Sequence, residues 1–177
     1  MTDFVEFDPE AHGSPTQRLT VRAATSADVD ALALVMSARG GTPDEYIDTA
    51  RRFIERLPVL FLAESEENEP IGWSGAQRHP ILPDGDPTWL VSGLTVVPSW
   101  RRRGIAIALL RQVTSAVAAI DPYAPLHSVI NVRNLASIAL HKRAGFAEID
   151  RGPTFAGITF TGGFGVLLER ASTAALP

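Results

Sequence analysis

The chain has 177 residues, 45% of them hydrophobic and 20% charged, with a formal net charge of -4. This composition suits one globular domain and excludes a general attraction to nucleic acid or to anionic membranes. It contains no cysteine, so disulfides, thiolate metal sites and a cysteine nucleophile are excluded. No apolar run is long enough to cross a membrane, and the acidic N-terminus lacks an export signal. We expect a cytoplasmic protein with an N-terminal arm (1–17), a single domain (18–170) and a C-terminal tail (171–177).

The first half of the chain predicts a strand, two helices and a hairpin. The expected elements are a strand at 18–23, helices at 26–40 and 42–57, and strands at 59–64 and 70–78 around an acidic turn. Thr25 or Ser26 suits the N-cap of the first helix. In the second helix Thr42, Pro43 and Glu45 form a capping box with proline at the first helical position. Hairpin strands are therefore expected beside a pair of helices.

The second half predicts strands that alternate with helices. The expected elements are a strand at 88–97, a helix at 104–121, a strand at 126–132, a helix at 134–145, and strands at 146–150 and 158–170. The element order is β-α-α-β-β-β-α-β-α-β-β, which predicts an α/β fold with a mixed sheet and helices on both of its faces. A right-handed crossover is expected between the strand that ends at Val97 and the strand that begins at Leu126.

Three arginines, Arg101, Arg102 and Arg103, stand just before the start of a predicted helix at Gly104. The N-terminal end of a helix already carries a partial positive charge, so this arrangement predicts an anion that the sequence does not supply. Backbone N–H groups beside a glycine can cradle a phosphate, and arginine forks suit its oxygens. Two alternatives stay open: a solvated helix start whose arginines pair with acids such as Asp121 or Glu148, and a nucleic-acid patch.

Two motifs give the chain a family resemblance. The stretch "RRRGIA", residues 101–106, follows "LTVVP" at the end of a strand, and "NLASIALHKRAGF", residues 134–146, follows the next strand. Together they resemble the two signature motifs of the GNAT superfamily of acyl-CoA-dependent N-acetyltransferases, and the order of elements resembles that of the family's fold. The resemblance covers about residues 18–170.

The resemblance implies a site for acetyl-CoA where the strands 88–97 and 126–132 separate. Main-chain N–H groups of 102–106 would hold the pyrophosphate, with arginines near the adenosine phosphate. The pantetheine arm would pair with the strand at 94–96, where one N–H would polarise the thioester carbonyl. The residues that the resemblance assigns to cofactor binding are Leu94, Thr95, Val96, Arg101, Arg102, Arg103, Gly104, Ile105, Ala106, Asn134 and Ser137. No metal site is expected, because the four histidines show no ligand spacing.

The family's activity implies transfer of an acetyl group to an amine by direct attack in a ternary complex. The position of the family's usual proton donor, a tyrosine, is taken by His141, whose imidazolium could protonate the leaving thiolate. Other interpretations of His141 stay open: a partly exposed helix histidine satisfied by a neighbour, no side-chain acid at all, or an acyl-CoA-binding regulatory domain without turnover. The acceptor would be a small-molecule or peptide amine, with no nucleic acid or membrane as partner. A homodimer is left open.

The general base is not evident. Many family members carry a carboxylate on the strand at 88–97, but here that strand has no acid and offers only Ser92, which could order a water. Glu64, at the end of an earlier strand, is the other candidate, against the simpler interpretation of a solvated strand-terminal glutamate. We therefore expect Ser92 or Glu64 to assist removal of the amine proton.

Other stretches bear on rival functions and on the acceptor. The stretch "GWSGA", residues 72–76, is similar to a hydrolase nucleophile elbow, but no helix can follow it directly. Candidate pocket walls are Tyr46, Trp73, Trp89, the link at 39–43 and the segment 152–160. Aromatic walls favour an apolar acceptor and the acidic turn at 64–69 favours a cation, so the acceptor stays open.

Overall fold

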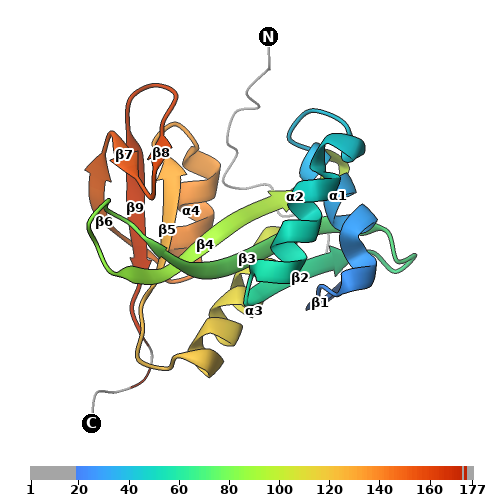
Figure 1. The fold of residues 1–177 in the computed structure, drawn as a ribbon, viewed down its shortest axis with the longest axis horizontal. Coiled ribbons are helices and arrows are strands. Elements are labelled where there is room, and N and C mark those ends of the chain that lie inside the picture. Colours follow the sequence, from blue (N-terminus) through green and yellow to red (C-terminus); the bar gives the residue numbers. More distant parts are fainter. Residues whose placement is uncertain (1–18, 173, 175–177) are drawn as a thin grey trace.

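A seven-stranded mixed sheet forms the centre of the structure, a computed structural model that describes residues 19–172 and 174 (Figure 1). The predicted N-terminal arm, 1–17, lies outside the described residues. The strand order is β1-β2-β3-β4-β5-β9-β6, and β7 pairs with β8 in a small second sheet. The strands are β1 (Thr20–Ala23), β2 (Val59–Glu64), β3 (Pro70–Pro80), β4 (Pro87–Val96), β5 (Leu126–Asn131), β6 (Ala147–Gly152), β7 (Thr154–Phe155), β8 (Ile158–Thr159) and β9 (Gly165–Arg170).

Helices cover both faces of the sheet, as the sequence predicts (Figure 1). They are α1 (Val29–Ser37), α2 (Pro43–Arg56), α3 (Ile105–Ile120) and α4 (Leu135–Arg143), with short 3-10 turns at Ser26–Asp28 and Pro98–Trp100. The start of α2 confirms the predicted capping residues, because the Thr42 N–H donates to Glu45 Oε2 at 3.2 Å and Pro43 is its first residue. No helix within the described residues is long and apolar enough to cross a membrane.

Alternate residues of β2 build two cores, one on each face of the sheet. Leu60 and Leu62 pack with α1, α2 and Trp73, while Val59 and Ala63 join the clusters that include residues of α3. Because successive side chains of a strand point to opposite faces, an apolar run such as 59–63 fits a strand covered on both sides. The central strands are thereby fixed between two helical layers.

The sheet opens between β4 and β5. The two strands are parallel, but they pair only at Trp89 with Leu126 and at Leu90 with His127. Beyond these pairs β4 runs on to Val96 beside β3, and β5 continues beside β9, so the strands diverge (Figure 1). The separation expected between the strands 88–97 and 126–132 is therefore present.

The prediction of one continuous strand at 158–170 is wrong, because the chain turns in the middle of this range. The range 158–170 holds two separate strands, β8 and β9, joined by a turn in which Gly162 and Gly163 have φ of 93° and 98°. Positive φ is open to glycine at little cost, and two such residues reverse the chain direction. The expected single strand is thereby divided between the small sheet and the central sheet.

Candidate functional site

The N-terminus of α3 has the backbone geometry of an anion site. Its N-cap is Gly104, in the left-handed region at φ +80°, and a Cβ placed there would meet no atom within 4 Å. The first N–H groups of a helix have no backbone acceptor, and α3 is sixteen residues long. Open space above Gly104 therefore leaves room for a phosphate group at these donors.

The three arginines before Gly104 are exposed, and two of them contact residues that lie close by in the sequence. Arg101 Nε donates to Val96 O at 3.3 Å, and the Arg103 guanidinium lies 4.8 Å from the ring centroid of Trp100. The acids considered as their partners have others. Asp121 binds Arg78 and Trp89 Nε1, and Glu148 binds Arg151 and Lys142. The charge at this helix start is thus not explained by those two carboxylates.

Leu94 and Val96 turn their backbone groups toward the side on which β5 diverges. The Val97 N–H donates to Ile71 O on β3 at 3.0 Å, and alternate residues of an antiparallel strand face the same neighbour. The carbonyl of Leu94 accepts from Arg39 Nη2 at 2.7 Å, as that of Val96 does from Arg101. Two guanidinium groups therefore lie along this edge of β4. The contact of Arg39 was not expected from the sequence.

A β-bulge interrupts β4 next to this edge. The register changes from Gly75 opposite Gly93 to Ala76 opposite Val91, so Ser92 is the extra residue. A bulge bends its strand and aims side chains differently from a regular ladder, and such bulges are frequent beside active sites. The predicted catalytic candidate Ser92 thus occupies the irregular point of the strand.

Three buried polar atoms near the bulge lack a hydrogen-bond partner among the described residues: Trp73 Nε1, Ser92 Oγ and Thr95 Oγ1. Trp73 and Thr95 are directly opposite in the β3–β4 pair and are 5% and 4% exposed. An unsatisfied buried polar group costs about 1–3 kcal/mol, so three of them around one bulge need a physical reason. A polar ligand or a water that formed hydrogen bonds with these atoms would remove that cost.

His141 is buried at the inner end of the β4–β5 divergence. It is 2% exposed, its Nε2 lies 3.0 Å from Ser128 Oγ, and its Nδ1 lies 2.8 Å from Ser137 O. Ser128 is the first residue of β5 beyond the last pair with β4. The histidine is thus satisfied by its neighbours but is not partly exposed, which corrects one of the interpretations drawn from the sequence.

The hydrogen bonds of His141 assign its tautomer. Because Ser137 O can only accept, Nδ1 carries the proton, and in the neutral ring Nε2 then accepts from the Ser128 hydroxyl. Burial lowers the pKa of His141 below its ordinary value of 6.5, although the bond to Ser137 opposes this. The neutral ring therefore has no proton on the nitrogen that reaches toward β5.

Glu64 lies in an ion-pair network away from the bulge. Its two carboxylate oxygens contact Arg22 Nη2 at 2.5 Å and Arg22 Nε at 2.9 Å, and Arg22 also binds Asp28 at 2.7 Å. Glu64 pairs with Thr20 at the β1 side of the sheet. Both oxygens are committed to a guanidinium, which argues against the role of base considered from the sequence.

Asn134 and Ser137 form the N-terminal cap of α4. Asn134 Oδ1 accepts the Ser137 N–H at 3.1 Å, which is the N-cap hydrogen bond of α4. The rival motif at 72–76 lies inside β3, where Ser74 Oγ donates to Gly93 O at 2.7 Å. A mid-strand serine committed to the next strand does not form a nucleophile elbow.

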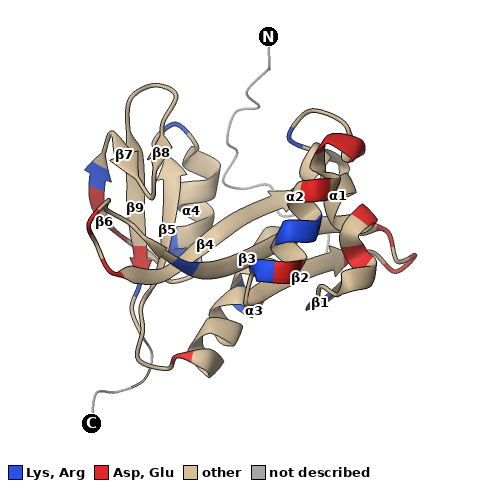
Figure 2. Cartoon of the chain, in the orientation of Figure 1, with Lys and Arg blue, Asp and Glu red and all other residues tan. Residues whose placement is uncertain are grey.

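Two of the candidate pocket walls are parts of the core. Trp89 is 3% exposed, and its ring lies 5.4 Å from the Arg78 guanidinium. Trp73 packs edge-on against Phe53 at 5.6 Å, and a Cβ on Gly93 would come within 2.5 Å of its ring. Figure 2 shows acidic positions at the β2–β3 turn and both acidic and basic positions on α2, whereas β4 carries no charged residue.

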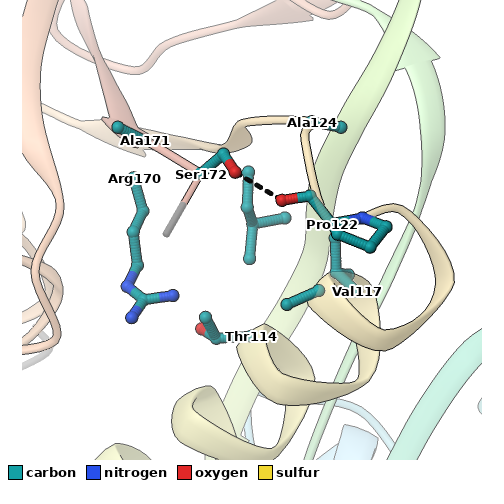
Figure 3. A pocket seen from close by; sticks show the side chains of 9 residues that line it. Thr114, Val117, Pro122, Ala124, Arg170, Ala171 and Ser172 are labelled. Atoms are coloured by element: carbon teal, nitrogen blue, oxygen red, sulfur yellow. Dashed lines mark hydrogen bonds between the residues drawn. The ribbon is translucent and has the colours of Figure 1, made fainter. Parts of the chain in front are cut away.

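The cavities of the molecule include one beside the C-terminal part of α3 (Figure 3). It measures about 10 Å³, and the Ser172 hydroxyl donates to Pro122 O across its rim. A groove of about 270 Å³ adjoins it, lined by Arg111, Thr114, Ser115, Ala118, Ala144 and Arg170. Neither is lined by residues of β4 or of the α3 N-terminus, so neither belongs to the site described above.

Comparison with known proteins connects this geometry to a family. The model of the "Acetyltransferase (GNAT) domain" matches residues 18–147. No curated protein matches the chain significantly. Within the described residues there is no group of three or more His, Asp or Glu side chains that could hold a metal ion. The family match covers the sheet up to β5, the α3 N-terminus and α4.

Solved structures share the fold over nearly the whole chain. A phosphinothricin acetyltransferase from Sinorhizobium meliloti, in complex with acetyl-CoA, has a TM-score of 0.69 at 22% identity and covers 90% of this chain and 92% of its own. The ribosomal-protein-S5-alanine acetyltransferase from Vibrio fischeri has a TM-score of 0.71 at 15% identity, with coverages of 93% and 98%. The protein yncA from Salmonella typhimurium, solved with acetyl-CoA, has a TM-score of 0.69 at 16% identity, with coverages of 90% and 97%.

Proposed function

The chain belongs to the GNAT acetyltransferase family, and on this premise we propose that it transfers an acetyl group from acetyl-CoA to a primary amine by direct attack in a ternary complex. The observation that carries this proposal is the opening of the sheet beyond Leu90, which ends beside a helix N-terminus capped by Gly104 in the left-handed conformation. Acetyl-CoA is the co-substrate of this family.

The residues around the opening suit acetyl-CoA. Backbone N–H groups of 102–106 would hold the pyrophosphate, and Arg101, Arg102 and Arg103 would neutralise phosphate charge. The edge at Leu94 and Val96 would take the pantetheine arm. Space above Gly104 and the unsatisfied atoms around the bulge support this assignment. The cap formed by Asn134 and Ser137 would line the far side.

The reaction needs a neutral amine beside the thioester. The amine nitrogen forms a bond to the acetyl carbonyl carbon, the C–S bond breaks with its electron pair on sulfur, and the nitrogen loses one proton while the sulfur gains one. An alkylammonium has a pKa of about 10.4, so proton removal limits the population that can attack. Direct attack suits a chain without cysteine. A backbone N–H of β4 at 94–96 would stabilise the oxyanion.

Water, rather than a side chain, would accept the proton of the amine and donate the proton to the leaving thiolate. Ser92 cannot be a base at neutral pH, but its buried hydroxyl has no described partner and could orient a water for the amine proton. His141 would act in its neutral form, holding the Ser128 hydroxyl at the inner end of the opening. An imidazolium donor at this position is disfavoured by burial.

A domain that binds acyl-CoA without turnover is the second candidate. Two observations favour it: the neutral, buried ring of His141 at the position of the family's usual acid, and the commitment of Glu64 to Arg22. Binding of acetyl-CoA does not separate the two candidates, since both require it. Release of free coenzyme A does.

The test is a thiol-release assay with a thiol-reactive dye. The protein has no cysteine, so it contributes no background signal. The protein is incubated with acetyl-CoA and a panel of amino acids, polyamines, aminoglycosides, arylamines and peptides with free N-termini. We expect amine-dependent thiol release with at least one class. Acetyl-CoA binding without release from any amine would favour the regulatory domain.

A further inference from the structure

Arg39 is placed by a glycine turn between α1 and α2. Gly40 and Gly41 follow it with φ of 126° and 84°, and the Tyr46 hydroxyl on α2 donates to Gly40 O at 3.0 Å. This turn directs the Arg39 side chain to β4, where Nη2 meets Leu94 O at 2.7 Å across 55 positions of sequence. The long-range contact fixes the guanidinium at the open edge of β4.

The Arg39 charge has no carboxylate partner among residues 19–172 and 174. Its hydrogen bond goes to the neutral carbonyl of Leu94, and a second cation, Arg101, acts on it electrostatically. Loss of water around the guanidinium, and after it the Arg101 charge, lower the pKa of Arg39, while Tyr46 opposes this. An arginine remains a cation at neutral pH even so.

The tip of Arg39 lies near the reacting end of the proposed acetyl-CoA site. Leu94 is two residues closer to the Ser92 bulge than Val96, whose carbonyl Arg101 binds on the side toward Gly104. The arginines at 101–103 thus serve the phosphate end, and Arg39 lies toward the thioester end. It reaches β4 from the α1–α2 layer, the layer against which Trp73 packs with its unsatisfied Nε1.

We infer that Arg39 binds an anionic group of the acceptor, so that the acceptor is an amine that also carries a carboxylate. The inference rests on the proposed acetyl transfer. A guanidinium presents five N–H donors in a planar fork, of which the described contact to Leu94 uses one nitrogen. The others can pair with a carboxylate in a bidentate manner and hold the amine of the same molecule near the bulge.

The charges of this region also disfavour polycations. Arg39 and Arg101 lie along one strand edge, and neither forms an ion pair with a carboxylate of the described residues, so a polyamine or aminoglycoside would meet repulsion there. The acidic turn before Pro70 is five residues of β3 away from the bulge at Gly75, which is about 16 Å along a strand. Acids at that distance do not offset the two guanidiniums at the edge of β4.

The test uses matched acceptors and matched variants. Each α-amino acid of a panel is compared with its carboxamide and its decarboxylated amine, in the wild type, in Arg39→Gln and in the control Arg56→Gln, an exposed arginine on α2. In the wild type we expect kcat/KM at least about tenfold higher for the acid than for its carboxamide. Arg39→Gln lowers kcat/KM of the acid about 10- to 100-fold, mainly through KM, and leaves the carboxamide within about twofold. Arg56→Gln changes neither.

Distinct results separate the failure of this inference from failure of acetyl transfer. Equal use of acid and carboxamide, or an unchanged kcat/KM of the acid in Arg39→Gln, would overturn the role of Arg39 while thiol release upholds the transfer. Loss of acetyl-CoA affinity in Arg39→Gln with an unaltered acid-to-amide ratio would also overturn it, because Arg39 would then serve the co-substrate. If no amine releases thiol, calorimetry with N-acetylamino acids on the coenzyme A-loaded protein decides. Binding that Arg39→Gln abolishes supports the inference, and no binding overturns it.

Discussion

His141 Nε2 accepts a hydrogen bond from Ser128 Oγ at 3.0 Å, joining α4 to β5 at the point where β5 leaves β4. The ring also packs against Phe146 at 5.2 Å in a T-shaped arrangement. The pair is buried, so each partner depends on the other for its hydrogen bond. His141, which the family resemblance places where a catalytic acid is expected, thus accepts a hydrogen bond in its neutral form.

Replacing His141 with phenylalanine should lower stability without removing a catalytic titration. The Ser128 hydroxyl loses its acceptor, which costs about 1–3 kcal/mol in free energy of unfolding at pH 7.5, measured by urea denaturation. The pH dependence of kcat between 6.5 and 8 should keep its shape, because burial lowers the pKa of His141 below 6.5 and leaves the ring mainly neutral in that range. Disappearance of an acid limb in the variant would show that an imidazolium donates a proton after all.

The pH dependence of the wild-type free energy of unfolding should reveal the lowered pKa of the buried His141. Its pKa is lower in the folded state than its ordinary value of 6.5, so the unfolded chain binds more protons as pH falls below that value. The free energy of unfolding should therefore decrease from pH 7 toward pH 5, and less steeply in His141→Phe. The control His79→Phe replaces a half-buried histidine that contacts Pro80 O. If both variants keep the wild-type slope, the lowered pKa of His141 is wrong.

Ser92→Ala separates a structural hydroxyl from a functional one. Because Ser92 Oγ is buried with no described partner, its removal should leave the free energy of unfolding unchanged or raise it slightly. If the hydroxyl orients a water for the amine proton, kcat should fall about tenfold or more with KM for acetyl-CoA unchanged. Steady-state kinetics with an active acceptor measure this, and a kcat equal to that of the wild type would remove Ser92 from the mechanism.

Gly104→Ala tests the anion site, with Gly157→Ala as a matched control. Both glycines have positive φ, +80° and +72°, and a Cβ at either meets no atom within 4 Å. Each variant should lose about 1–2 kcal/mol because alanine is strained in this region. Acetyl-CoA affinity, measured by calorimetry, should fall about tenfold in Gly104→Ala alone. Equal affinity in the two variants would place the pyrophosphate elsewhere.

Glu64→Gln should affect stability rather than turnover. The substitution removes the charge that Arg22 binds, and because the Arg22 side chain is 36% exposed we expect a loss of only about 1–2 kcal/mol. Arg22 also holds the pKa of Asp28 well below its ordinary value of 3.8, so the stability that this pair contributes is present above that pH and is lost progressively as the pH falls below it. A tenfold lower kcat in Glu64→Gln would restore Glu64 as a candidate base.

Local signals in the sequence predicted most of the fold, including the helix start at Gly104, where we propose that the co-substrate binds. The capping residues at Thr42 and Pro43, the helix start at Gly104 and the turn between β2 and β3 depend on neighbours within a few positions, so pattern alone specifies them. The turn at Gly162 and Gly163 was missed because the apolar residues around it suggested one continuous strand. The adjacent glycines were the signal that could have found it.

Contacts between distant segments could not be predicted in the same way. Arg39 meets Leu94 across 55 positions, and Glu64 meets Arg22 across 42, so only the folded sheet brings them together. The same holds for Ser128 and His141, which come from different elements. Ser128 is the one residue with a hydroxyl group in the predicted strand at 126–132. This was a weak sign of a functional or structural role, and only the contact with the His141 ring shows what the role is.

Hydrogen exchange by mass spectrometry, with and without saturating acetyl-CoA, tests the central claim most directly. We expect slower exchange of the amides in 94–106, where β4 and the α3 N-terminus would contact the co-substrate, and no change in the segment 154–164, which holds β7 and β8. Unchanged exchange in 94–106, or slowing confined to other segments, would contradict the proposed site.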